Sequence, residues 1–89
     1  MEIEFAPEKD SENIRRRGIP LAFGAVVLAN RIGEVEDGRQ DYGETRTRAF
    51  GEVDGLLFAC TYTMRGAVAR IISVHRVREK EMRKWLSAR

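Results

Sequence analysis

The sequence predicts an α+β fold in which two N-terminal helices pack on an antiparallel sheet and an amphipathic helix ends the chain. Three observations support this class. Residues 7–30 contain helix start and stop signals. A two-residue hairpin turn separates apolar segments at 54–55. Residues 76–89 combine basic side chains with an apolar stripe. The 89 residues can bury one modest core, so we expect residues 1–89 to form a single domain.

The N-terminal half is predicted to supply a short strand and two helices. Residues 2–5 alternate polar and apolar side chains, as a strand does. Pro7 suits a first helical turn and Gly18 suits the position after a helix, and the acidic residues between them precede the basic ones, as the helix dipole favours. A second helix is predicted over 20–30, because apolar residues recur there with helical spacing. We expect an edge strand within 31–41.

Two turns set the predicted register of a three-stranded meander, with short strands at its edges. The Asp-Gly pair at 54–55 is typical of a type I′ hairpin. Opposed residues of an antiparallel pair share a face, so this turn places Arg48 opposite Thr61. We expect the next turn at 65–66, which places Thr61 opposite Arg70. Arg48, Thr61 and Arg70 then form one row, where two arginines repel unless an anion or a carboxylate lies between them.

Charge is distributed unevenly along the chain. Residues 1–45 carry 10 acidic and 6 basic side chains, whereas residues 46–89 carry 4 acidic and 10 basic ones. Arginine supplies 13 of the 16 basic residues, and its planar fork suits bidentate contact with phosphate. The basic half is therefore predicted to meet a polyanion, and a solvated charged surface is the alternative.

Composition excludes several classes of protein. No apolar run approaches the ~20 residues that span a bilayer, and the acidic N-terminus does not resemble a signal peptide, so we expect a cytoplasmic protein without membrane contact. The single cysteine, Cys60, excludes an intramolecular disulfide, and with one histidine a structural zinc site is not expected. The chain has no glycine-rich nucleotide loop, and we expect no cofactor and no metal.

RNA cleavage is one reaction that the remaining side chains suit. It needs a base for the 2′-hydroxyl proton, cations for the charge on phosphorus, and an acid for the leaving 5′-oxygen. Arginines suit the second task, and Glu44 or His75 suits the others, since His75 is the single imidazole. The plainer alternatives are that Glu44 neutralises Arg46 and that His75 is structural. Two other hypotheses stay open: a nucleic-acid-binding module without chemistry, and a subunit whose arginines hold an acidic partner.

Several motifs, in order, resemble one family: Tyr-Gly-Glu-Thr-Arg at 42–46, Arg-Ala-Phe-Gly at 48–51, Tyr-Thr-Met-Arg-Gly at 62–66 and Arg-Ile-Ile-Ser-Val-His-Arg at 70–76. With the spacing of the N-terminal segment, they make the chain similar to the BrnT-type toxins of bacterial toxin–antitoxin pairs. The resemblance implies a fold like that of the RelE-type ribonucleases and an endoribonuclease that cuts RNA and stalls translation. It also implies a BrnA-like antitoxin with a ribbon-helix-helix domain, through which the complex contacts operator DNA.

The resemblance and the charge pattern together give the candidate site residues. The resemblance points to Glu44, Arg46, Arg48, Tyr62, Arg65, Arg70 and Ser73. We add His75 as the single imidazole, and Arg76, Lys80 and Arg83 from the basic C-terminal segment. Of these, we assign catalysis to Glu44, Arg46, Arg48, Arg70 and His75, and RNA binding to the others. The family usually shows Lys-His-Gly where this chain has Arg-Arg-Gly at 16–18, which leaves His75 for proton transfer.

Overall fold

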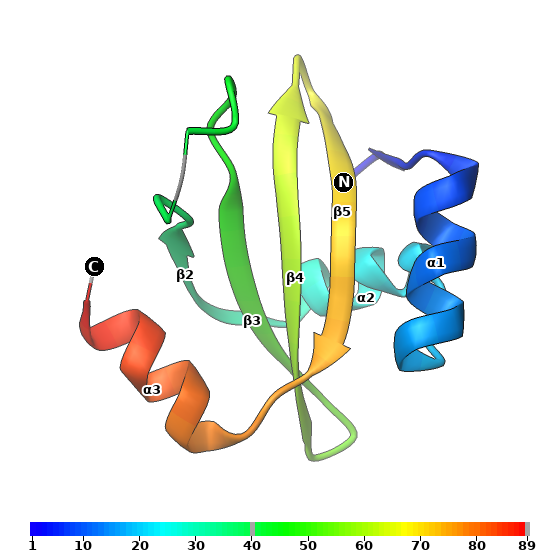
Figure 1. The fold of residues 1–89 in the computed structure, drawn as a ribbon. Coiled ribbons are helices and arrows are strands. Elements are labelled where there is room, and N and C mark those ends of the chain that lie inside the picture. Colours follow the sequence, from blue (N-terminus) through cyan, green and yellow to red (C-terminus); the bar gives the residue numbers. More distant parts are fainter. Residues whose placement is uncertain (40, 89) are drawn as a thin grey trace.

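Five strands form one mixed sheet in the computed structural model, which describes residues 1–39 and 41–88 (Figure 1). They lie in the order β1-β5-β4-β3-β2, with β1 parallel to β5 and the other neighbours antiparallel. The strands are β1 (Ile3–Glu4), β2 (Arg31–Glu36), β3 (Thr47–Val53), β4 (Leu56–Arg65) and β5 (Val68–Arg76). The predicted α+β class is confirmed, and β2 is the strand expected within 31–41.

Helices lie on both faces of this sheet. The helix α1 spans Pro7–Arg17, α2 spans Gly24–Ala29 after a 3-10 turn (η1, Leu21–Phe23), and α3 spans Glu79–Ser87. In Figure 1, α2 lies behind the strands, α1 stands beside the β5 edge, and α3 lies at the lower left. Gln40 and Arg89, which belong to the predicted segments 31–41 and 76–89, lie outside the described residues. None of the described helices combines the length and the apolar character needed to cross a membrane.

The main core lies between α2 and the sheet. Gly51 of β3 permits their close approach, because a Cβ at this position would lie 2.4 Å from the carbonyl oxygen of Val27. Burial raises the pKa of the Cys60 thiol in this core to about 12, so Cys60 is a packing residue. The buried members of the core are Leu21, Val27, Leu28, Ala49, Phe58, Cys60, Tyr62, Ala69, Ile71 and Val74.

A buried amide anchors α1, which has little apolar surface to contribute. Ile14 is 46% exposed, whereas Asn13 is buried. The Nδ2 of Asn13 donates to the carbonyl oxygens of Val74 (2.9 Å) and Ile19 (2.8 Å), and its Oδ1 accepts from the backbone N–H of Val74 (3.2 Å). Strand β1 pairs with β5 only at Ala69 and Arg70, so it does not reach Val74. The side chain of Asn13 therefore supplies the hydrogen bonds that a neighbouring strand would give to Val74. This contact fixes α1 next to His75.

The first hairpin has the predicted turn and register. Asp54 and Gly55 have φ values of 52° and 79°, as a type I′ turn requires. The pairing runs from Val53 opposite Leu56 through Arg48 opposite Thr61, so the predicted face of every residue in this hairpin is confirmed.

The second hairpin differs from the prediction. Its turn is formed by Gly66 and Ala67, and among the two only Gly66 has a positive φ (62°), which is the pattern of a type II′ turn. A β-bulge then interrupts the pairing of β4 with β5 and leaves Ile72 without a directly opposed residue. The predicted turn at 65–66 is therefore wrong, and the register changes along the strand.

The bulge changes which side chains share a row across the sheet. Ser73 lies opposite Thr61, whereas Arg70 lies one row further, opposite Thr63. The predicted row of Arg48, Thr61 and Arg70 is thus wrong. All three side chains still lie on one face, because Thr61 and Thr63 are two residues apart on β4.

A second, smaller core lies on this other face, under α3. The helix contributes the apolar stripe that the sequence predicts, and it covers only one end of the face. In Figure 1, none of the labelled helices lies in front of the strands between α1 and α3. The buried residues and the side chains of α3 that pack on them are Phe50, Ala59, Val77, Met82, Trp85 and Leu86.

Candidate active site

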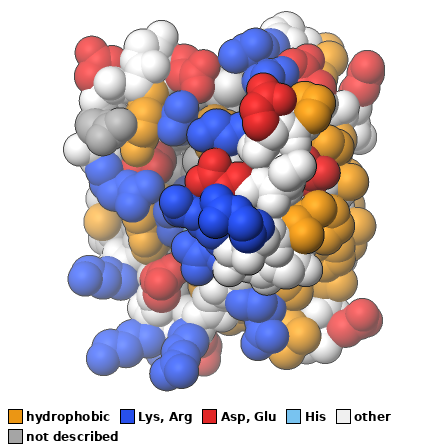
Figure 2. All heavy atoms as spheres, turned by 45° about the vertical axis from the view of Figure 1, so that its right-hand side comes forward, with side chains coloured by type: hydrophobic (Ala, Val, Ile, Leu, Met, Phe, Trp, Pro, Cys, Tyr) orange, Lys and Arg blue, Asp and Glu red, His pale blue; other side chains and the backbone are white. Residues whose placement is uncertain are grey.

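A cleft lined by cationic side chains opens on the uncovered face, between α1 and α3. Two adjoining cavities of about 330 and 540 Å³ share Arg17, Arg39, Arg48 and His75 as lining residues. Arg17 ends α1, Arg39 follows β2, Arg48 lies on β3 and His75 lies on β5, so four elements converge here. Figure 2 shows Lys and Arg side chains gathered across the middle of the molecule, with acidic side chains among them. We call this site the His75 cleft.

Arg48 is a buried cation with a free hydrogen-bond donor. The residue is 7% exposed, and its guanidinium carbon lies 4.2 Å from the centroid of the Trp85 ring. Its Nε is buried and has no hydrogen-bond partner among the described residues. Burial, together with the nearby charge of Arg39, lowers the pKa of Arg48. Arg48 also lines both cavities, so its guanidinium is placed to form charge-assisted hydrogen bonds with an anionic oxygen in the cleft.

His75 and a carboxylate lie next to Arg48. One oxygen of Glu81, on α3, lies 3.8 Å from His75 Nε2 and 3.9 Å from Arg48 Nη1. Burial lowers the pKa of His75, and the charges of Arg48 and Arg17 lower it further, whereas Glu81 opposes them. The imidazole is therefore neutral at neutral pH and able to accept a proton, and the carboxylate stands where it can stabilise the imidazolium that results.

A buried carboxylate, Asp37, holds Arg39 at the cleft. Asp37 is 3% exposed, and its two carboxylate oxygens accept from Arg39 Nε and Nη2, both at 2.9 Å. These hydrogen bonds lower the pKa of Asp37. The guanidinium carbon of Arg39 lies 5.1 Å from the centroid of the Trp85 ring, so Trp85 carries two guanidinium groups at the mouth of the cleft.

Three of the other predicted arginines gather in a separate place on the same face. Arg46, Arg65 and Arg70, which we call the arginine cluster, line a hollow of about 190 Å³ together with Glu44. Glu44 pairs with Arg46 at 3.2 Å and with Arg65 at 3.9 Å, and Arg70 pairs with Glu4 of β1. The structure thus divides the residues that the sequence assigned to catalysis: Arg48 and His75 meet in the His75 cleft, and Glu44, Arg46 and Arg70 meet in the cluster.

Tyr62 lies on the opposite face of the sheet from both sites. It is 5% exposed, and its hydroxyl donates to Glu34 and accepts from Arg31, both at 3.2 Å. Burial and the charge of Glu34 raise the pKa of Tyr62. The structure therefore does not bring Tyr62 together with the other predicted RNA-binding residues. Ser73 is also separate from them, because it lines the His75 cleft with Arg48 and His75.

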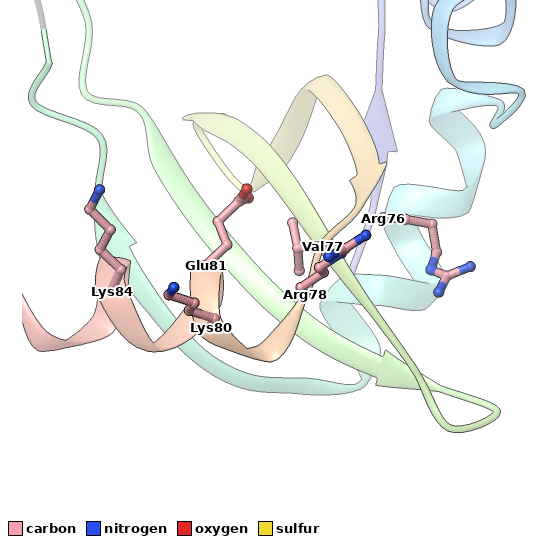
Figure 3. Close-up of a pocket in the computed structure, with 6 residues that line it drawn as sticks. All are labelled: Arg76, Val77, Arg78, Lys80, Glu81 and Lys84. Atoms are coloured by element: carbon pink, nitrogen blue, oxygen red, sulfur yellow. The ribbon is translucent and has the colours of Figure 1, made fainter.

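A third hollow, of about 570 Å³, lies where β5 leads into α3 (Figure 3). Figure 3 shows Glu81 extending from α3 toward the strands, and Arg76 extending on the side of α2. Glu81 and Lys84 also line the His75 cleft, so the two spaces meet at α3. Arg83 is separate, because it pairs with Glu79 (2.7 Å) on the exposed side of the helix. The lining residues are Arg76, Val77, Arg78, Lys80, Glu81 and Lys84.

Sequence reasoning did not assign Arg17, Arg39, Glu81 or Trp85 to the site. A signal existed for two of them, since Glu81 and Trp85 are four residues apart and therefore lie on one side of α3. Arg39 follows a strand in a segment without periodicity, and no local pattern predicts its contact with Trp85. Arg17 stands at the position where the resemblance implied a histidine, and it lines the same cavities as His75.

The His75 cleft places guanidinium groups beside a neutral imidazole in an α+β fold. This combination defines a class of protein whose site suits binding of a phosphodiester and transfer of a proton beside it. The family model of BrnT, the ribonuclease toxin of a type II toxin–antitoxin system, matches residues 5–81, and the chain belongs to this family. The predicted resemblance is confirmed, and family membership gives the chain RNA as its target and an antitoxin as its partner. A comparison with curated proteins finds no match.

Proposed function

We propose that this ribonuclease toxin cleaves RNA in the His75 cleft without a metal ion. The observation that carries the proposal is the position of Arg48, whose guanidinium lines both cavities of the cleft and shares a carboxylate neighbour with a neutral imidazole. Arg48 would bind the scissile phosphate, with Arg17 and Arg39 in reach at the walls of the cleft.

The reaction is an internal transesterification. His75 accepts the proton of the 2′-hydroxyl, the 2′-oxygen attacks phosphorus, and the bond from phosphorus to the 5′-oxygen breaks. The guanidinium groups stabilise the negative charge that develops on phosphorus, and Glu81 stabilises the protonated imidazole. The leaving 5′-oxygen takes a proton from solvent at the open side. The products are a 2′,3′-cyclic phosphate and a 5′-hydroxyl, and DNA is no substrate because it has no 2′-hydroxyl.

The resemblance supports a finer proposal for the partner. We propose a BrnA-like antitoxin with a ribbon-helix-helix domain, which would bring the toxin to operator DNA only through the antitoxin. We also propose that the toxin acts in the cytoplasm, where cutting RNA inhibits translation. The support for these proposals is family membership together with the basic half of the chain, which suits an acidic partner as well as RNA.

The test is cleavage of RNA by the purified protein in excess EDTA, with the new ends identified chemically. Wild type should produce cyclic phosphate ends, and His75→Gln should lower kcat by about 10²–10⁴-fold. Arg48→Gln should lower it by about 10²–10³-fold. Arg15→Gln, which removes an exposed arginine of α1, is the matched control and should leave kcat unchanged.

Three results would contradict the proposal. Full activity in His75→Gln would remove the imidazole from the chemistry. Loss of activity in EDTA with recovery on adding a divalent cation would overturn the metal-independent mechanism. Salt-sensitive binding of RNA by wild type without any new ends would favour a nucleic-acid-binding module that uses the same cleft.

A further inference from the structure

The arginine cluster carries more positive charge than its carboxylates neutralise. Arg46, Arg65 and Arg70 line the hollow with Lys9 of α1, which makes four cations. The carboxylates that pair with them are Glu44 and Glu4. Four cations and two anions leave an excess of positive charge around a hollow of about 190 Å³. Because the cations repel one another, an anion that enters the hollow is bound favourably.

The carboxylates and an aromatic ring hold these guanidiniums in position. The Arg46 Nε donates to Glu44 at 3.2 Å, and its guanidinium carbon lies 3.9 Å from the centroid of the Tyr42 ring. A guanidinium has five N–H donors, so a carboxylate on one edge leaves the other edge for a further acceptor. The Oγ1 of Thr63, on the floor of the hollow, donates to the carbonyl oxygen of Thr45 at 2.7 Å and ties the 42–46 segment to β4.

The hollow adjoins the His75 cleft. Lys9 and Ile72 line both spaces, so one wall of the cleft is also a wall of the hollow. Arg46 and Arg48 are two residues apart on one side of the chain, which corresponds to about 6.8 Å along a strand. A strand of duplex DNA advances about 3.4 Å along its axis per phosphate, and an unstacked single strand of nucleic acid extends further. Neighbouring phosphates of one strand can therefore reach both places.

We propose that the arginine cluster is a second phosphate subsite, which binds a phosphate flanking the scissile one in single-stranded RNA. The inference rests on the proposed function, since it takes the His75 cleft as the place of cleavage. Glu44 then has a positioning role, because it orients Arg46 and Arg65 and touches no reacting atom. The pentapeptide at 42–46 supplies both this carboxylate and the ring that supports Arg46.

Substrates of two lengths test this subsite. A dinucleoside monophosphate has only the scissile phosphate, whereas a hexanucleotide with the same central step has flanking phosphates. In Arg65→Gln, which changes an exposed side chain at a strand end, the KM for the hexanucleotide should rise about tenfold with kcat unchanged. Both constants for the dinucleoside monophosphate should stay within twofold of wild type. The slope of log KM against log salt for the hexanucleotide should fall by about 0.7.

Arg15→Gln is the matched control, and it should change none of these values. Equal losses on both substrates, or no loss on either, would overturn the subsite. A binding measurement separates this inference from the proposed chemistry: fluorescence anisotropy of a labelled hexanucleotide whose central 2′-hydroxyl is replaced by hydrogen. Tighter binding by wild type than by Arg65→Gln supports the subsite even if wild type cleaves neither substrate, a result that would overturn the proposed function alone. Equal binding overturns the subsite.

Discussion

Replacing Asn13 by alanine tests whether a polar contact holds α1 on the sheet. The change removes three hydrogen bonds and leaves the backbone N–H and C=O of Val74 without partners in a buried place. Each unsatisfied buried group costs about 1–3 kcal/mol, so Asn13→Ala should lower the free energy of unfolding by about 2–4 kcal/mol. For a chain of this length, that is a large share of a total of about 4–13 kcal/mol.

The assay is urea and thermal denaturation followed by circular dichroism. A loss of about 2–4 kcal/mol should lower Tm by about 10–25 °C in a domain of this size. Asn30→Ala is the control, because the Nδ2 of Asn30 also donates to a backbone carbonyl (2.8 Å), but on an exposed surface where water can replace it. We expect a cost of about 0.5 kcal/mol or less there. Equal destabilisation by the two variants would refute the assignment of Asn13 as the anchor of α1.

Three further predictions follow from the site and the core. Because burial lowers the pKa of His75, the acidic limb of the kcat/KM profile should lie below pH 6.5. Glu81→Gln should move this limb to lower pH, because the Glu81 carboxylate raises the pKa of His75. Arg17→Gln should move it to higher pH, because the Arg17 guanidinium lowers the same pKa. A limb that neither variant moves would rule out His75 as the titrating group. If an imidazole on either wall of the cleft is sufficient for cleavage, the exchange variant R17H/H75R should keep more activity than H75R alone. Equal inactivity of the two variants would show that the imidazole must stand at position 75. Gly51→Ala should destabilise the protein by about 1–3 kcal/mol in urea denaturation, because the new Cβ would lie 2.4 Å from a carbonyl oxygen of α2. Gly38→Ala is the control and should cost little, because nothing lies within 4 Å of a Cβ at that position. Similar costs of the two substitutions would contradict the close approach of α2 to β3.

The part of the fold that local chemistry determines was predictable. The Asp-Gly pair at 54–55 requires positive φ at both positions, which fixes one turn type and with it the register of the whole first hairpin. The Gly-Ala pair of the second turn has no such unique signal, because Gly66 can occupy more than one position of a turn. The bulge at Ile72 has no local signal either, and the contacts that surround it are tertiary: Val74, two residues later, is buried in the core and hydrogen-bonded to Asn13.

The candidate site was predictable only in composition. The sequence indicates that arginines gather on one face and that His75 is the single imidazole, and both hold in the structure. It could not indicate that the bulge separates Arg70 from Arg48, because one extra residue in a strand changes the opposed pairs without changing the pattern. The roles of Trp85 and Glu81 depend on where α3 docks, which is a tertiary event.

The central claim is that RNA binds in the His75 cleft. His75 and Trp85 both line this cleft, and they are the single histidine and the single tryptophan of the chain, so each gives a signal of its own. The direct measurement is titration with a hexanucleotide RNA whose 2′-hydroxyls are methylated, following the imidazole proton resonances by NMR and the indole fluorescence. We predict that both signals change and saturate with the same Kd, and that Arg48→Gln weakens both together. Binding of the RNA with neither signal perturbed would contradict the claim and would place the substrate elsewhere on the protein.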